Sequence, residues 1–181
     1  MNGQSSAQEQ SSAQKLSIYG AFSRKEDSCS REEFDNLGNY VFAEQDTQDT
    51  VAVRNINGNN VPSGEKTSIS RDQFLNCYLP EPALYNNKVL PAIRELNETI
   101  EQGEKALENE EFLSAEYEFK NALAIDEKNI RATFDLGLTY LEMQDWESTE
   151  QVFQKLIKME APFQREHKHL FNKFGIELRK K

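Results

Sequence analysis

The sequence of 181 residues predicts a mainly α protein, in which helix-turn-helix repeats follow a small β hairpin or sheet module and a disordered N-terminal tail. A period of 34 residues predicts the repeats, because the stretch from 96 to 129 aligns with the stretch from 130 to 163. Alternating apolar and polar residues between 40 and 56 predict strands. A polar start with few aromatic residues predicts the tail.

The disordered tail is expected over residues 1–28. Gln, Ser and Ala dominate it, and such a segment cannot bury enough apolar area to offset about 1–2 kcal/mol of backbone ordering per residue. The stretch from Leu16 to Phe22 is more apolar. We interpret it as the end of the tail, with a short docking motif as the alternative.

A small β-containing module is expected over residues 29–80. Residues 40–44 and 50–56 indicate two strands, and Asn57 with Gly58 begins a turn. A loop over residues 61–64 is expected to lead to a short strand near Ile69. Ser70 and Gln73 form a capping box for a short helix. So small a sheet is marginally stable alone, so it is expected to pack on a helix.

The repeat domain is expected over residues 81–181. Prolines at 80 and 82 end the β module, since proline restricts the residue before it. Residues 83–90 are expected to form a helical turn or two, and Pro91 suits the first turn of the next helix. Further on, Asp145 is expected to cap a helix that starts at Trp146.

Two glycines fall inside the predicted repeat helices. Gly103 and Gly137 each cost about 1 kcal/mol there relative to alanine. The missing Cβ compensates if a facing helix approaches closely, and the small residue Ala115 on that helix supports this interpretation. Phe119 and Phe153 occupy equivalent positions in the two repeats and are expected to be buried.

These residues together resemble the tetratricopeptide repeat family over about residues 91–181. The second repeat matches the family pattern at Leu136, Gly137, Tyr140 and Phe153, and the first supplies Gly103, Ala115, Phe119 and Ala122. Departures from the pattern are Gln102, Ala106, Thr149 and Leu156, with Glu127 and Ala161 where proline is usual. A third copy starts near Gly175, and the sequence ends before its second helix, which predicts two full repeats plus a terminal helix.

The resemblance implies a protein–protein interaction module or scaffold, which binds a peptide or a partner surface through the concave face of its repeats. By position, the groove would comprise Asn97, Glu104, Arg131, Phe134, Asp135, Leu138, Asn172, Lys173 and Ile176. Ile100 and Glu104 stand where the family's carboxylate clamp uses Lys and Asn, so a clamp is not expected.

A second candidate surface is an apolar edge on the terminal helix, formed by Leu170, Phe171, Phe174 and Leu178. Terminal repeats normally carry a polar outer face. We therefore expect this edge to drive self-association or to dock a partner. The alternative functions are a structural subunit docked through this half repeat and, less favoured, a β module that binds a ligand or carries an enzymatic activity.

No catalytic set can be proposed from the sequence. His167 and His169 are two residues apart and point to different faces of a helix, so no metal site, cofactor or enzyme activity is expected. The net charge of −10 disfavours nucleic acid, and no apolar run suits a membrane span. Cys29 and Cys77 are expected to be free thiols in a reducing cytoplasm, with a disulfide between them as the less favoured alternative.

Overall fold

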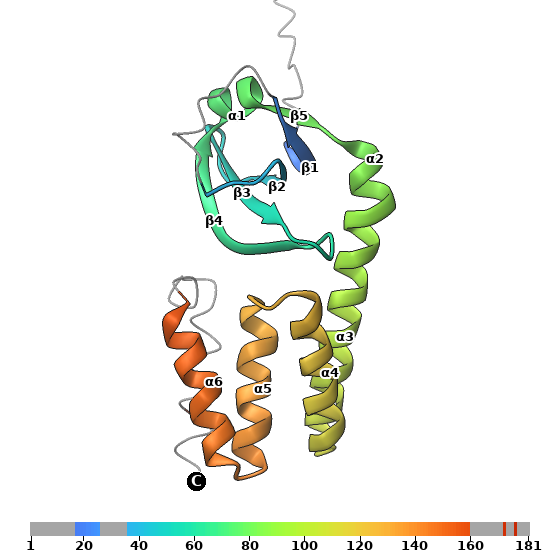
Figure 1. The fold of residues 1–181 in the computed structure, drawn as a ribbon, viewed down its shortest axis with the longest axis vertical. Coiled ribbons are helices and arrows are strands. Elements are labelled where there is room, and N and C mark those ends of the chain that lie inside the picture. The colour runs from blue at the N-terminus through green and yellow to red at the C-terminus, as the bar shows by residue number, and fades with distance from the viewer. Residues whose placement is uncertain (1–16, 26–35, 160–171, 173–175, 177–181) are drawn as a thin grey trace, which may run out of the picture.

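The computed structural model describes residues 17–25, 36–159, 172 and 176. A five-stranded antiparallel sheet forms the first half of this part, and helices follow it (Figure 1). The mainly α class that the sequence predicts is therefore wrong, since a complete sheet precedes the helices where only a small module is predicted. The cause is local: one strand lies in the predicted tail, and another begins in the predicted loop.

The sheet has the strand order β4-β3-β2-β1-β5. Its strands are β1 (Tyr19–Arg24), β2 (Tyr40–Gln45), β3 (Thr50–Ile56), β4 (Pro62–Ser70) and β5 (Tyr78–Pro80). The predicted strands at 40–44 and 50–56 are confirmed as β2 and β3. The third strand is longer than predicted, because β4 takes in most of the expected loop.

Strand β1 corrects the predicted extent of the disordered tail. It lies between β2 and β5, with Tyr19 opposite Glu44 and Phe22 opposite Val41. Ala21 and Phe22 are both buried, although neighbouring residues of a strand face opposite sides of the sheet. A strand that is buried on both faces has no simple alternation of apolar and polar residues, so its pattern did not identify it.

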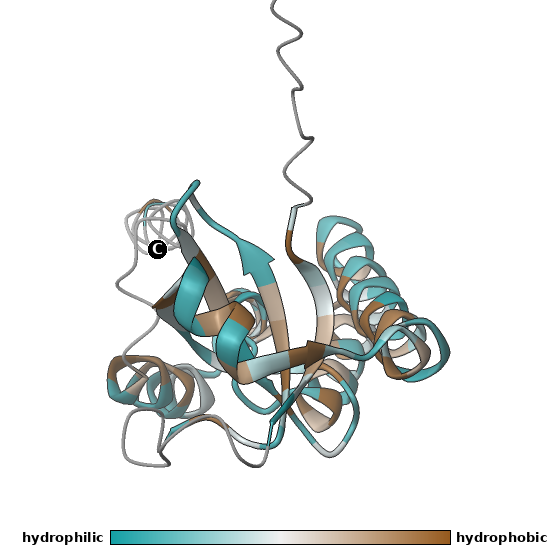
Figure 2. Ribbon diagram, turned by 90° about the horizontal axis from the view of Figure 1, so that it is seen from above, coloured by the Kyte–Doolittle hydropathy of each residue, from teal (hydrophilic) through white to brown (hydrophobic). Residues whose placement is uncertain are grey.

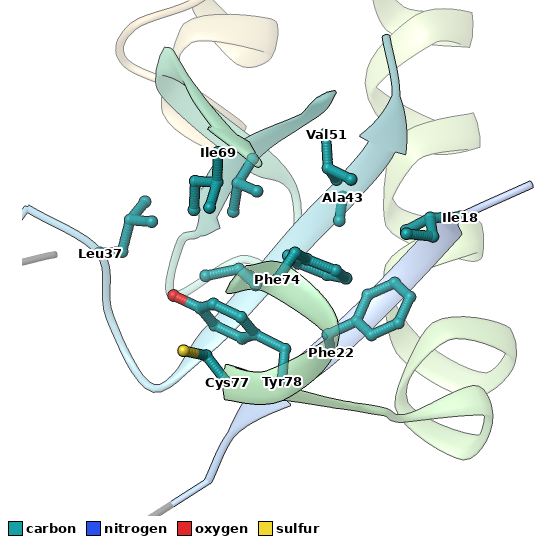
Figure 3. Close-up of a cluster of buried hydrophobic side chains, with 11 residues drawn as sticks. Ile18, Phe22, Leu37, Ala43, Val51, Ile69, Phe74, Cys77 and Tyr78 are labelled. Atoms are coloured by element: carbon teal, nitrogen blue, oxygen red, sulfur yellow. The ribbon is translucent and has the colours of Figure 1, made fainter. Parts of the chain in front are cut away.

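Helix α1 (Arg71–Cys77) covers one face of the sheet. The predicted N-cap at Ser70 is confirmed, because the Ser70 hydroxyl accepts a hydrogen bond from the Gln73 amide at 3.3 Å. The Gln73 side chain departs from a capping box, since its Oε1 accepts from the Ser70 hydroxyl at 3.0 Å. Phe74 is fully buried, and its ring centroid lies 4.9 Å from that of Phe22 and 4.9 Å from that of Tyr78 (Figure 3). These rings form the centre of the core between α1 and the sheet.

Cys77, in the same core, is disulfide-bonded. The predicted free thiol is therefore wrong at this position. The sequence contains one other cysteine, Cys29, which lies outside the described residues.

A helix covers part of the opposite face of the sheet. The segments α2 (Pro82–Leu84), η2 (Tyr85–Val89, a π-helical turn) and α3 (Leu90–Glu108) follow one another without a break. Val89 is fully buried against Ala21 and Phe42 of the sheet. The expected helical turns before Pro91 are thus confirmed, and they attach the sheet to the first repeat helix.

The helical half continues with α4 (Phe112–Ile125), α5 (Ile130–Glu142) and α6 (Trp146–Lys158). Figure 1 shows these helices running alternately up and down. Figure 2 shows hydrophobic and hydrophilic residues along the same helices, as expected for amphipathic elements that bury one face. Asp145 caps α6 as predicted, because its carboxylate accepts a hydrogen bond from the Ser148 amide at 3.1 Å.

The period of 34 residues recurs in the backbone of the two turns that close the helix pairs. Glu110 has φ 62° and Gln144 has φ 61°. The amide of the next residue then reaches back five residues: Glu111 bonds Ala106 at 2.8 Å, and Asp145 bonds Tyr140 at 3.0 Å. Both turns therefore end their helices in the same Schellman motif.

The two glycines also occupy equivalent places. A Cβ at Gly103 would lie 2.7 Å from the Phe119 ring, and one at Gly137 would lie 3.1 Å from Val152 and 3.5 Å from Phe153. Ala115 is fully buried on the facing helix. The expected close approach is confirmed, and it is tightest in the first helix pair. Phe119 is fully buried as predicted, whereas Phe153 is only partly buried.

We predict that Phe119→Ala lowers the free energy of unfolding by about 3–5 kcal/mol, the usual cost of deleting a buried phenylalanine. Leu113→Ala on the same helix is the control: Leu113 is 73% exposed, so its loss should cost less than about 0.5 kcal/mol. Urea melts of both variants give the measurement. Equal losses for the two variants would contradict this packing.

We also predict that reducing the Cys77 disulfide lowers the free energy of unfolding by about 2–4 kcal/mol, the typical stabilisation by a disulfide. Thermal melts with and without reductant measure the loss, and the Cys77→Ala variant should show no further response to reductant. Iodoacetamide labelling of the unreduced, unfolded chain is the chemical check. Two labelled thiols per chain would exclude the bond.

Candidate functional site

The predicted groove residues are only partly exposed. Asn97 is exposed on α3. Glu104 and Arg131 form a bidentate salt bridge between α3 and α5. Arg131 Nε lies 2.7 Å from Glu104 Oε1, and Arg131 Nη2 lies 2.5 Å from Glu104 Oε2. The hydrogen bond that Arg131 donates to Glu104 is the main cause that raises the pKa of the Arg131 guanidinium. This pair holds two neighbouring helices together.

Three other predicted groove residues lie in the interior. Residues 132–141 of α5 are all buried. Phe134 and Leu138 pack with Leu141 and Leu156, and Asp135 is 2% exposed. These side chains therefore do not line an open groove in this structure, and a role in binding stays a prediction for them.

The last predicted residues are on or beyond the edge of the described chain. Asn172 and Ile176 are exposed helical residues, and Ile176 is 54% exposed. Lys173 lies outside the described residues, and so does the whole predicted association edge of Leu170, Phe171, Phe174 and Leu178.

The structure brings together a different set of residues, at the junction between sheet and helices. The turn between β3 and β4 meets the carboxyl end of α4. Asn57 Nδ2 donates a hydrogen bond to the Ile125 carbonyl at 2.9 Å, and Asn59 Nδ2 donates to the carbonyls of Ala124 and Ile125 at 3.1 and 2.9 Å. The last carbonyls of a helix have no partner inside it, so these amides satisfy them from the sheet side.

An apolar contact and a buried carboxylate complete the junction. Val61, just before β4, is fully buried in the core formed by α3, α4 and α5. Ser63 Oγ donates a hydrogen bond to Asp126 Oδ1 at 2.6 Å, and the Lys128 amide lies 3.2 Å from the same oxygen. Asp126 is only 4% exposed, so these donors compensate for the loss of its hydration.

Two clefts flank this junction. The first, of about 520 Å³, is polar and is lined by residues of β3, β4 and the α4–α5 turn. Its asparagines are already bonded within the protein: Asn55 Oδ1, for example, accepts a hydrogen bond from the Gly38 amide at 2.6 Å. The polar residues of this cleft therefore serve the surrounding turn and strands, and we do not assign a ligand to it.

The second cleft, which we call the lysine cleft, has a volume of about 530 Å³ and lies between the start of β4, the α4–α5 turn and the end of α6. Lys128, Lys155 and Lys158 line it together with the apolar side chains of Ile130 and Met159, and Glu65 and Glu127 are the acidic residues of its wall. None of the three amines has a salt-bridge partner within the described part of the chain.

Unpaired amines beside apolar side chains can bind a carboxylate that carries an apolar neighbour. The sequence did not reveal this cleft, because its residues come from positions 64 to 159. The sequence did hold a signal for the junction, in the run Asn57-Gly-Asn-Asn60, whose side-chain amides are suited to capping another element.

One ionisable cluster lies elsewhere on the helices. Tyr140 Oη donates a hydrogen bond to Glu116 Oε1 at 3.0 Å, and Lys120 Nζ lies 2.6 Å from the same oxygen. The hydrogen bond from Lys120 lowers the pKa of Glu116, and the same bond raises the pKa of Lys120. Burial raises the pKa of Tyr140. These shifts keep each group in its usual protonation state. The hydrogen bond from Tyr140 to Glu116 joins α5 to α4.

Comparisons with protein-family models, curated proteins and solved structures found no match. None of the helices in the described part of the chain has both the length and the apolar content to span a bilayer. Among the same residues, no group of three or more His, Cys, Asp or Glu side chains is placed to hold a metal ion.

We predict that Ser63→Ala lowers the free energy of unfolding by about 1–3 kcal/mol, because the buried Asp126 carboxylate loses a donor. Ser68→Ala on the same strand is the matched control. Ser68 is exposed, so its change should stay within about 0.5 kcal/mol. Chemical denaturation measures both. If Ser63→Ala proves as stable as its control, the junction does not depend on this bond.

Proposed function

We propose that the protein is a non-enzymatic protein–protein interaction module that binds a peptide or surface segment of a partner protein. The observation that carries the proposal is the lysine cleft, where three exposed amines lie beside the half-buried side chains of Ile130 and Met159. These amines have no salt bridge within the described residues. This combination suits an acidic segment with an apolar residue.

The arrangement of the helices supports the same proposal. Two helix pairs with equivalent turns and glycine contacts at a spacing of 34 residues are what a tetratricopeptide-like array requires. Such arrays act as scaffolds for partner proteins. Of the groove predicted for the array, Asn97, Arg131, Asn172 and Ile176 are the exposed members. The Arg131 guanidinium is already paired with Glu104, so we assign binding to the lysine cleft.

The cytoplasmic location expected from the sequence is not part of this proposal. Disulfides persist mainly in oxidising compartments, and Cys77 is disulfide-bonded. A partner in an oxidising compartment is therefore the consistent choice.

Selection from a random peptide library tests the proposed function. We predict that the parent protein enriches acidic peptides with apolar residues, and that Lys155→Glu with Lys158→Glu abolishes their binding by reversing the charge of the cleft. Lys88→Glu is the matched control, since Lys88 is exposed on η2 outside the cleft. Failure to enrich any peptide over an unrelated protein would refute the proposal, as would peptides that bind the double variant equally well.

A further inference from the structure

The two ends of the helical half differ in charge. Because the helices alternate in direction, the α3–α4 and α5–α6 turns lie at the end away from the sheet (Figure 1). The α3–α4 turn carries Glu108, Glu110 and Glu111, all of them exposed. Their carboxylates have no hydrogen bond or salt bridge within the described residues. The lysine cleft lies at the opposite end, beside the sheet.

The acidic turn, formed by residues 108–111, has a conformation that backbone hydrogen bonds fix. Glu110 adopts φ 62°, a conformation that favours glycine, and amide bonds to the Leu107 and Ala106 carbonyls at 3.1 and 2.8 Å fix the turn. Glutamate at this position is intrinsically unfavourable, so its carboxylate is kept there at a cost in stability. A rigid segment loses little conformational freedom on binding.

Apolar side chains accompany the acidic turn. Leu113, at the start of α4, is 73% exposed, and Tyr117 one helical turn further on is 64% exposed. The turn thus presents three carboxylates with an apolar neighbour. The lysine cleft presents three amines and two carboxylates, those of Glu65 and Glu127, together with Ile130 and Met159. Its net charge is therefore opposite in sign to that of the turn, and both surfaces carry apolar side chains.

We propose that the lysine cleft of one molecule receives the acidic α3–α4 turn of a second copy of this chain. Because the two surfaces differ, the contact is heterologous, and each molecule keeps one free cleft and one free turn. Assembly therefore proceeds head to tail, into a ring if the rotation closes and into a filament if it does not. This inference rests on the proposed function, since it uses the same cleft.

Sedimentation equilibrium of the full chain tests the contact. We expect the average mass to rise above the 20.9 kDa of one chain as the concentration increases from about 10 µM to about 500 µM in dilute salt. It should return to that of one chain near 1 M salt, where exposed charges are screened beyond about 3 Å. Parent protein that remains monomeric throughout overturns the inference.

Two neutralised variants locate the contact. The cleft variant carries Lys128→Gln, Lys155→Gln and Lys158→Gln, and the turn variant carries Glu108→Gln, Glu110→Gln and Glu111→Gln. Each should be monomeric alone. Their equimolar mixture should form a 1:1 dimer and grow no further, because only one intact cleft and one intact turn remain to pair. A mixture that stays monomeric, or that grows beyond the dimer, overturns the inference.

The matched control neutralises three other exposed carboxylates of α3, in Glu95→Gln, Glu98→Gln and Glu101→Gln. It should assemble as the parent does, and loss of assembly in this control means that net charge alone is responsible, which overturns the inference. Glu110→Gly is a further variant that suits the turn conformation and should weaken assembly without unfolding the chain. If the parent is monomeric while selected peptides still bind the cleft, the self-contact fails and the proposed function stands.

Discussion

The docking of the β3–β4 turn on the carboxyl end of α4 determines how the two halves of the molecule are arranged. Amides of Asn57 and Asn59 bond helix carbonyls that otherwise need water, while Val61 enters the helical core. Polar capping and apolar burial thus act within five residues of one turn. Because β4 leaves this turn directly, the position of its first residues against α6, and hence the lysine cleft, follows from the same contact.

The helix that leads from the sheet to the repeats provides the second connection. Val89 packs on the sheet face through Ala21 and Phe42, and the same helix continues to Gly103, where Phe119 of α4 approaches closely. The start of this helix therefore packs in the core beside the sheet, and its later turns pack in the core of the first helix pair. With the β3–β4 turn already bound to α4, the sheet and the first helix pair are joined at two separate places, which restricts rotation about either one.

Local signals in the sequence predicted local structure well. The caps at Ser70 and Asp145, the strands β2 and β3, and the glycines facing a neighbouring helix all depend on residues close in the chain or on a fixed repeat. Strand β1 was missed because its residues are buried on both faces, and the extent of β4 because Pro62 and Gly64 resemble a loop. The burial of Phe134 and the lysine cleft depend on contacts between distant segments, which no local pattern records.

The lysine cleft is notable because lysines from two separate elements line it. Among the described lysines, Lys120 pairs with Glu116 on the same helix and Lys66 pairs with Glu44. Lys155 and Lys158 also suit the carboxyl end of α6, whose dipole favours positive charge, and this alone would explain them on an open helix end. It does not explain Lys128, which reaches the same cleft from the α4–α5 turn and lies over Gly64. Amines from two elements therefore lie together beside apolar side chains, and our proposal that the cleft binds an acidic segment depends on that convergence.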